Sequence, residues 1–372
     1  MRILILNWRS LFDPFTGGAE TATFEHAKRW VKNHDAQVTW LSPIYNKKIR
    51  SENSEGINFK YLGFVPHSPN FFVRSLRFFI FYIYVFFYCI KSRNDFDIVI
   101  DQVHGLPYLT PLYIQNKIVV YIHEVAGDIW NKMIPFPLNI IGKFLESSSL
   151  KFYKNRPIVT VSESTKNDLI RIGIPEANIH VVNNGINAPQ FQNLNSTKKG
   201  NFTILFLNRV VKMKGPERAI KILALLKKYI PDAHLDIIGK YEPAYHAELQ
   251  SYASSLNVLN DIKFYGFVDE DEKFRIIRQS NVLINTSYKE GWGLVNIEAN
   301  SQGVPVVAFN VEGNVDSVKN GVNGYLSDSE DAFAKNIYKL SQENLSASCI
   351  EYAQQFNWEK KSEEFWNLLQ NV

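Results

Sequence analysis

Runs of apolar residues alternate with helical patterns along almost the whole chain. In the first half, short apolar runs predict strands at residues 2–6, 37–41, 98–100, 117–122 and 158–161, and periodic apolar positions predict helices at 19–32 and 163–172. Ser162 is a suitable N-cap for the second helix, and Gly173 followed by Pro175 supplies its end. Strands that alternate with helices are typical of βαβ units, so the sequence predicts an α/β fold with parallel sheets.

The alternation stops once and then starts again. Residues 187–201 are rich in Asn, Gln, Ser, Lys and Gly and contain few apolar residues, as is typical of a linker. Beyond them, strands are predicted at 203–207, 234–238, 262–265, 282–285 and 306–309, and helices at 216–229, 245–256, 271–279 and 294–301. We therefore expect two Rossmann-like, doubly wound domains, at residues 1–187 and 201–355, joined by a linker at 188–200. In such sheets ligands bind beyond the carboxyl ends of the strands, and with two domains the expected site is the cleft between them.

Length and composition agree with this organisation and exclude several classes of protein. A chain of 372 residues with 45% hydrophobic and 21% charged residues is long enough for two folded domains. The net charge of +4 suits phosphates or an acidic membrane surface, but it is too small and too dispersed to indicate nucleic acid as a partner. Cys89 and Cys349 form neither a disulfide framework nor a zinc motif, which favours the cytoplasm. The apolar run at the N-terminus is too short for a signal peptide and is interpreted as the first strand.

Residues 71–91 raise the question of membrane contact. Between Arg77 and Lys91 the sequence has 13 uncharged residues, many of them aromatic, whereas a spanning helix needs about 20 apolar residues. One interpretation is a buried helix of the domain core. The other is a helix at the membrane interface, with the aromatic side chains of 78–90 among the headgroups and the flanking basic residues on phosphates.

Two sets of residues in the first half follow predicted strands. Gly17 and Gly18 open the first helix, where their backbone can approach an anion closely, although a structural turn would explain them equally well. His123, followed by Glu124, comes directly after the strand at 117–122. Its imidazole can donate to a sugar hydroxyl or a carbonyl group, and the alternative is a histidine hydrogen-bonded to neighbouring backbone.

The second half carries the more specific pattern. Arg209 and Lys214 follow the first strand of this half, and a guanidinium with an ammonium group suits a diphosphate whose negative charge grows as it leaves. Glu290 follows the strand at 282–285, and Glu298 lies about one turn into the next helix, so both carboxylates can accept hydrogen bonds from sugar or ribose hydroxyls. Gly291 and Gly293, on either side of Trp292, leave backbone amides available near the start of that helix at Leu294.

These residues resemble the motifs of family-4 retaining glycosyltransferases, which have the GT-B fold of two Rossmann-like domains facing across a cleft. Glu290 and Glu298 match the family's paired-glutamate motif, and Gly266, Phe267 and Val268 resemble the loop that approaches the nucleotide base. Residues 183–186 and 320–326 resemble two further family segments. Asn208, Asn183, Trp292, Asp316 and the sequence at 312–314 depart from the usual residues.

The resemblance implies a role for each matching residue. Residues 1–187 would bind the acceptor, residues 201–355 would bind the nucleotide sugar, and a C-terminal helix at 356–372 would pack back on the first domain. Arg209 and Lys214 would bind the donor diphosphate, Glu290 the transferred sugar, and Glu298 the ribose. The donor site would also include the residues of three glycine-containing loops: Gly17, Gly18, Gly266, Phe267, Val268, Gly291, Trp292, Gly293 and Leu294.

The resemblance also implies a reaction. His123 would orient groups near the sugar, and the enzyme would be a retaining hexosyltransferase without metal or cofactor. The donor would be a UDP- or GDP-linked sugar, the acceptor a glycan or a lipid-linked molecule, and the location the cytoplasm or the inner face of the membrane. Two alternatives stay open on the sequence: a nucleotide-sugar epimerase or hydrolase on the same fold, and a non-catalytic scaffold subunit.

Overall fold

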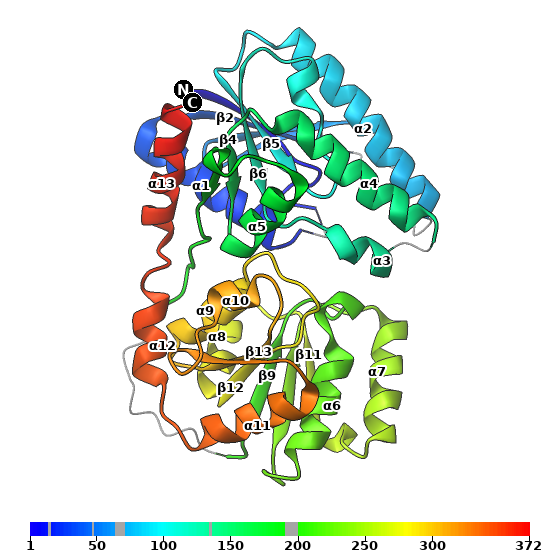
Figure 1. Ribbon diagram of the computed structural model, residues 1–372, viewed down its shortest axis with the longest axis vertical. Helices are drawn as coiled ribbons and strands as arrows, with labels where there is room; N and C mark the ends of the chain where they lie inside the picture. Colours follow the sequence, from blue (N-terminus) through cyan, green and yellow to red (C-terminus); the bar gives the residue numbers. More distant parts are fainter. Residues whose placement is uncertain (14–15, 47, 64–70, 134–135, 190–199) are drawn as a thin grey trace. The chain divides into compact units, whose positions relative to one another are not determined.

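The computed structural model describes residues 1–13, 16–46, 48–63, 71–133, 136–189 and 200–372 (Figure 1). They form two compact units: Met1–Gly185 together with Trp358–Val372, and Ile186–Asn357. Most of the linker expected at 188–200 lies outside the described residues, since 190–199 are not included.

The first unit is built on an eight-stranded sheet with the strand order β3-β4-β2-β1-β5-β6-β7-β8. Every adjacent pair is parallel except β3 with β4. The strands are β1 (Arg2–Leu6), β2 (Gln37–Pro43), β3 (Ser51–Ser54), β4 (Ile57–Leu62), β5 (Ile98–Val103), β6 (Lys117–Ile122), β7 (Ile158–Thr160) and β8 (Ile179–Val181). The central strands are almost wholly apolar because helices cover both faces of a parallel sheet.

The helices of this unit connect the strands. They are α1 (Gly18–His34), α2 (Phe71–Lys91), α3 (Trp130–Met133), α4 (Leu138–Leu150), α5 (Glu163–Ile172) and α13 (Trp358–Gln370), with short 3-10 turns η1 (Thr110–Leu112), η2 (Gly127–Ile129), η3 (Lys151–Tyr153) and η4 (Glu176–Asn178). The capping predicted for α5 is confirmed, because Ser162 Oγ accepts from Thr165 N at 3.2 Å and Gly173 ends the helix with φ 100°. Within the described residues, no helix is both long enough and apolar enough to cross a membrane.

The last helix of the chain belongs to the first unit. α13 packs on α1 through an aromatic cluster in which the Phe365 ring lies 5.1 Å from Trp30 and 5.2 Å from His26. The C-terminal residues therefore complete the core of a sheet that begins at Arg2.

The second unit has a six-stranded sheet with the order β11-β10-β9-β12-β13-β14, and every pair in it is parallel. This is the doubly wound order, with the switch point between β9 and β12. The strands are β9 (Thr203–Leu207), β10 (His234–Ile238), β11 (Ile262–Gly266), β12 (Val282–Asn285), β13 (Val306–Phe309) and β14 (Gly324–Ser327). The helices are α6 (Pro216–Leu226), α7 (Pro243–Ser255), α8 (Glu270–Gln279), α9 (Leu294–Ser301), α10 (Asn314–Ser317), α11 (Glu330–Ser341) and α12 (Ser346–Ala353), with 3-10 turns η5 (Lys212–Lys214) and η6 (Leu259–Asp261).

Alternate residues of the central strand enter separate cores on the two faces of this sheet. Ile204 and Phe206 pack with residues of α6, α7 and α11, whereas Leu205 and Leu207 pack with residues of α8 and α9. Both faces are buried, so the uninterrupted apolar run of β9 is what a doubly wound sheet requires.

Most strands predicted from the sequence coincide with those of the structure, and the omissions share a cause. β3, β4, β8 and β14 were not predicted. β3, β8 and β14 lie at sheet edges and are short or polar, and β4 buries only alternate residues, so none presents a continuous apolar run.

We predict that His26 makes the protein acid-labile. The imidazole is fully buried among aromatic rings, neither ring nitrogen has a hydrogen-bond partner in the described residues, and burial lowers its pKa to about 3. Unfolded histidine has a pKa near 6.5, so between these values the unfolded chain binds a proton that the folded chain does not, and stability falls as the pH drops below about 6.5.

The measurement is urea unfolding of the wild type and of His26→Leu at pH 8, 6 and 5. The variant is expected to lose about 1.4 kcal/mol less stability per pH unit between pH 6 and 5. Equal slopes in the two proteins would contradict this assignment.

Candidate active site

The loops at the carboxyl ends of the second sheet are joined by backbone hydrogen bonds. Asn208 N donates to Ile238 O at 3.1 Å, after β9 and at the end of β10, and Gly239 N donates to Gly266 O at 2.8 Å. On the other side of the switch point, Glu290 N donates to Glu312 O at 3.1 Å. The parallel pairing therefore brings residues far apart in sequence to one edge, where the predicted donor-site residues of this unit lie.

Lys214 and Glu290 form an ion pair at this edge. Lys214 Nζ lies 2.6 Å from Glu290 Oε1, and the two side chains are 17% and 11% exposed. The same carboxylate oxygen accepts from Ser287 Oγ at 2.6 Å and from Asn208 Nδ2 at 3.5 Å. Burial by itself raises the pKa of Glu290, but Lys214 and these hydrogen bonds outweigh it and hold the pKa below its usual range. Glu290 is therefore an ionised acceptor in a largely dry position.

Two glycines near this ion pair have no room for a side chain. Gly215 has φ 64°, and a Cβ there would lie 2.4 Å from Thr286 O. Thr286 Oγ1 in turn donates to Lys214 O at 3.0 Å and to Gly215 O at 2.8 Å. Gly313 is equally restricted, since a Cβ there would lie 2.3 Å from Glu290 O. These contacts fix Lys214 against the loop that carries Glu290.

Arg209, unlike Lys214, has its side-chain donors free to bind a ligand. Its side chain is exposed at the carboxyl end of β9, and it has no hydrogen bond or ion pair to any residue that the structure describes. An exposed guanidinium without a partner keeps its donors for a ligand.

Glu298 forms a second, partly buried ion pair. It is the fifth residue of α9, and its Oε1 lies 2.9 Å from Nζ of Lys273 on α8, with the two side chains 15% and 13% exposed. Burial raises the pKa of Glu298 even though Lys273 acts in the opposite direction. The two glutamates of the predicted motif thus have opposite pKa shifts because their surroundings differ.

The remaining predicted donor-site residues of this unit range from exposed to buried. Gly266 ends β11, and Phe267 beyond it is 71% exposed, with Lys240 Nζ 4.8 Å from its ring centre. Trp292 is instead only 5% exposed and packs on Phe356 at 5.1 Å. Gly293 is the N-cap of α9, which begins at Leu294, and Gly291 lies on the other side of Trp292. Val268 directly follows Phe267.

In the first unit, the loop before α1 is closed by an acidic side chain. Gly17 N donates to Glu20 Oε2 at 2.8 Å, and Trp8 Nε1 donates to Glu20 Oε1 at 3.2 Å. The carboxylate therefore occupies the helix N-terminus that Gly17 and Gly18 were predicted to offer to an anion, and the Gly17 amide is already engaged.

His123 stands beside a second histidine that was not predicted. The rings of His123 and His104 are 6.4 Å apart and nearly parallel, and His104 stacks on Trp8 at 5.0 Å. Burial lowers the pKa of each histidine to about 3, and neither Nε2 has a hydrogen-bond partner in the described residues. Both imidazoles are neutral at ordinary pH and can act as hydrogen-bond donors or acceptors, not as charges.

Sequence reasoning missed four residues of these sites. Lys273 and His104 act through partners on other elements, whereas Ser287 and Glu20 contact Glu290 and Gly17, each three residues away along the chain. The only local signals were the position of His104 directly after a strand, which is the signal that identified His123, and that of Glu20 in the first turn of α1.

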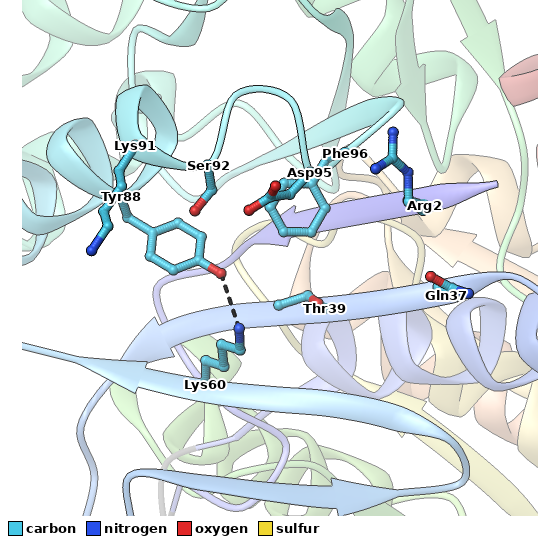
Figure 2. Close-up of a pocket in the computed structure, with 9 residues that line it drawn as sticks. All are labelled: Arg2, Gln37, Thr39, Lys60, Tyr88, Lys91, Ser92, Asp95 and Phe96. Atoms are coloured by element: carbon cyan, nitrogen blue, oxygen red, sulfur yellow. Dashed lines mark hydrogen bonds between the residues drawn. The ribbon is translucent and has the colours of Figure 1, made fainter.

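One cavity of the first unit lies away from all these residues. It has a volume of about 380 Å³ and includes Arg2 and Gln37 at the amino ends of β1 and β2. Figure 2 shows Lys60 and Tyr88 meeting across it, with Lys60 Nζ 3.4 Å from the hydroxyl group. No predicted site residue lines this cavity. The described residues also contain no cluster of three or more His, Cys, Asp or Glu side chains that could hold a metal ion.

Comparisons with known proteins assign both halves of the chain. Residues 16–189 match the family model described as Glycosyltransferase Family 4, and residues 188–356 match Glycosyl transferases group 1. An uncharacterized glycosyltransferase of Methanocaldococcus jannaschii is 24% identical in an alignment that covers 100% of this chain and 99% of the relative.

Solved structures show the same fold. Sucrose-phosphate synthase from Thermosynechococcus elongatus superposes with a TM-score of 0.79 at 18% identity, covering 100% of this chain and 98% of that one. HepE of Anabaena, solved in complex with UDP and glucose, has a TM-score of 0.77 at 18% identity with 100% of both chains covered.

The fold and the edge of the second sheet define a two-domain α/β protein of the GT-B class. With glycosyltransferase family models matched in both halves, the chain is a GT-B glycosyltransferase.

We predict that Lys214 and Glu290 are energetically coupled. Lys214→Met leaves a buried carboxylate without its counter-charge and should destabilise the protein by about 3 kcal/mol at pH 7. Glu290→Gln in the same chain should recover at least about 1 kcal/mol of that loss. Urea unfolding of both single variants and the double variant measures the coupling, and additive effects would show that the pair contributes nothing.

Proposed function

We propose that this protein is a retaining, family-4 hexosyltransferase that uses a UDP- or GDP-linked sugar. Its acceptor is a glycan or a lipid-linked molecule, and the reaction needs neither metal nor cofactor. The proposal depends on a contrast between two basic residues of the loop between β9 and α6. Arg209 is exposed and unpaired in the described residues, whereas Lys214 is paired with Glu290. One cation is free to bind a diphosphate, and the other is fixed in position.

The paired glutamates support the donor assignment. Glu290 is ionised and buried, so it can accept hydrogen bonds from hydroxyls of the transferred sugar. Glu298 is anchored by Lys273 and is proposed to accept from the ribose hydroxyls. Phe267 offers an exposed ring for the base, next to the positive charge of Lys240. The UDP and glucose in the HepE complex are consistent with a nucleotide-sugar donor.

The reaction proposed is a same-face substitution. The bond between the anomeric carbon and the diphosphate oxygen breaks, and the acceptor hydroxyl oxygen forms a new bond to that carbon on the same face. The departing phosphate oxygen takes the acceptor proton, and the nucleoside diphosphate leaves. Arg209 and Lys214 stabilise the negative charge that grows on the diphosphate, which is the largest electrostatic requirement of this step.

The first unit is proposed to bind the acceptor and to orient the sugar. The neutral His123 can exchange a hydrogen bond with a sugar hydroxyl through its unpartnered Nε2. Gly17 and Gly18 are proposed to border the phosphates, with the Gly17 amide shared with Glu20. For a lipid-linked acceptor, peripheral contact through residues 71–91 would bring the enzyme to its substrate.

We expect Arg209→Met to lower kcat/KM for the donor by about 100-fold, because it removes charge stabilisation at the leaving diphosphate. Stability should stay unchanged, since the side chain is exposed. Lys212 lies on the same loop, is also exposed and serves as the matched control, with an expected change below about 3-fold for Lys212→Met. Steady-state kinetics of the two variants measure the difference, and equal losses of kcat/KM would show that Arg209 does not bind the donor diphosphate.

A second prediction concerns metal and stereochemistry. Activity should persist when divalent metals are removed with EDTA, because the two cations supply the charge that a metal would otherwise supply. NMR of the first product formed should show the anomeric configuration of the donor retained. Loss of activity that Mg²⁺ or Mn²⁺ restores, or an inverted product, would contradict the mechanism. If the nucleotide sugar is converted at the same rate with and without an acceptor, the result would favour an epimerase or a hydrolase.

A further inference from the structure

Helix α2 is apolar on both its inner and its outer side. Phe81, Val85 and Cys89 are buried in the core of the first unit. The opposite side carries large apolar side chains in the open: Phe79 and Phe87 are each 64% exposed, accompanied by Leu76, Ile83, Tyr84, Phe86 and Ile90. A helix that is apolar all round and covered on one side has an unpartnered face. The two interpretations of 78–90 therefore each describe one side of the same helix.

Helix α4 shows the same pattern. Leu150 at its end is buried, whereas Phe144 is 66% exposed, and the exposed apolar residues continue along the helix and its flanks: Phe136, Leu138, Ile140, Ile141, Leu145 and Phe152. The turn η1 adds Leu112, which is 59% exposed. Nothing in the sequence pattern of 136–152 singled out this segment.

The two helices lie on the same face of the eight-stranded sheet. Phe81 and Val85 of α2 share one core cluster with Leu150 and with Tyr153 of η3. The segment around η1 joins them, since Tyr82 of α2 donates to Leu106 O, and Thr110 N donates to the Tyr153 hydroxyl at 3.0 Å. Figure 1 shows α2 and α4 along the same side of this sheet. Their outward side chains therefore belong to one layer, called here the α2–α4 platform: residues 76–90, 112 and 136–152.

The charge of these segments is one-sided. The chain as a whole has 41 basic and 37 acidic residues. Residues 71–91, 106–114 and 136–154 contain a single acidic residue, Glu146, which is 1% exposed and accepts hydrogen bonds from Ala126 N, Gly127 N and Trp130 Nε1. Their basic residues are Arg74, Arg77, Lys91, Lys143, Lys151 and Lys154. At the end of α2, Lys91 shares the cavity of Figure 2 with Lys60.

We propose that the α2–α4 platform docks on an anionic lipid bilayer, with its exposed apolar side chains in the interface and Lys91, Lys151 and Lys154 on lipid phosphates. This extends the contact proposed for residues 71–91, on which it rests, by a second helix and by the charge of the lipid. Monomeric proteins rarely expose a contiguous apolar surface larger than a few hundred Å² without a partner for it. Aromatic and basic side chains together are typical of helices that lie in a membrane interface.

The charge also explains the choice of a lipid over a second copy of this chain. A symmetric dimer brings the same surface of two copies together, so exposed lysines such as Lys151 and Lys154 would face like charges on the partner. An anionic bilayer neutralises them instead.

The experiment is flotation of the full chain with phosphatidylcholine vesicles, with and without about 30% phosphatidylglycerol. Ile141→Ser/Phe144→Ser tests α4, Phe79→Ser/Phe87→Ser tests α2, and Tyr229→Ser/Tyr338→Ser is the matched control with two exposed aromatic residues of the second unit. We expect the wild type and the control to float with anionic vesicles and each platform variant to partition about ten-fold less. Lys151→Gln/Lys154→Gln should weaken binding to anionic vesicles alone.

Each contrary result would overturn a specific part of the membrane-docking proposal. Wild-type binding by the α4 variant would restrict the contact to α2, and equal binding to neutral vesicles would remove the role of anionic lipid. No flotation, together with a dimer in light scattering that the platform variants dissolve, would assign the surface to a second copy. Thermal stabilisation by nucleotide sugars, measured on the same variants without lipid, should equal that of the wild type. Absence of such stabilisation in the wild type would count against the proposed donor site and leave the flotation result intact.

Discussion

The parallel pairing of all six strands in the second unit is the constraint on which its chemistry depends. Because every strand runs in the same direction, the loops after β9, β10, β11, β12 and β13 leave the sheet at one edge. Residues from Asn208 to Gly313 are gathered there by backbone hydrogen bonds between loops and by glycines at close contacts. The position of Arg209, Lys214, Glu290 and Glu298 thus follows from sheet topology.

Charge compensation decides what this edge can bind. Glu290 is buried and Glu298 is partly buried, and each is paired with a lysine, so neither carboxylate is left without a counter-charge. Arg209 lies outside these pairs, and the edge therefore keeps one guanidinium for a ligand while its carboxylates stay fixed. A site of this kind is organised before its substrate arrives, which is the condition for electrostatic stabilisation of a transition state.

The first unit uses different means at its own carboxyl edge. Glu20 closes the start of α1, and His104 and His123 are neutral because burial opposes their protonation. The two imidazoles therefore offer hydrogen bonds and not charge at this edge. The same unit also carries the exposed apolar side chains of α2 and α4, with basic residues in the same segments.

By itself the sequence determined the α/β class, most strands of both sheets and the residues that follow them, because a strand covered on both faces must be a continuous apolar run. It also pointed to Arg209, Lys214 and the two glutamates, which stand in local motifs at strand ends. Only the tertiary structure decided that Lys273 neutralises Glu298, that His104 stands beside His123, and that α4 shares the exposed layer of α2. Each of these depends on a partner distant along the chain or on which side of a helix is covered, and local patterns do not carry that information.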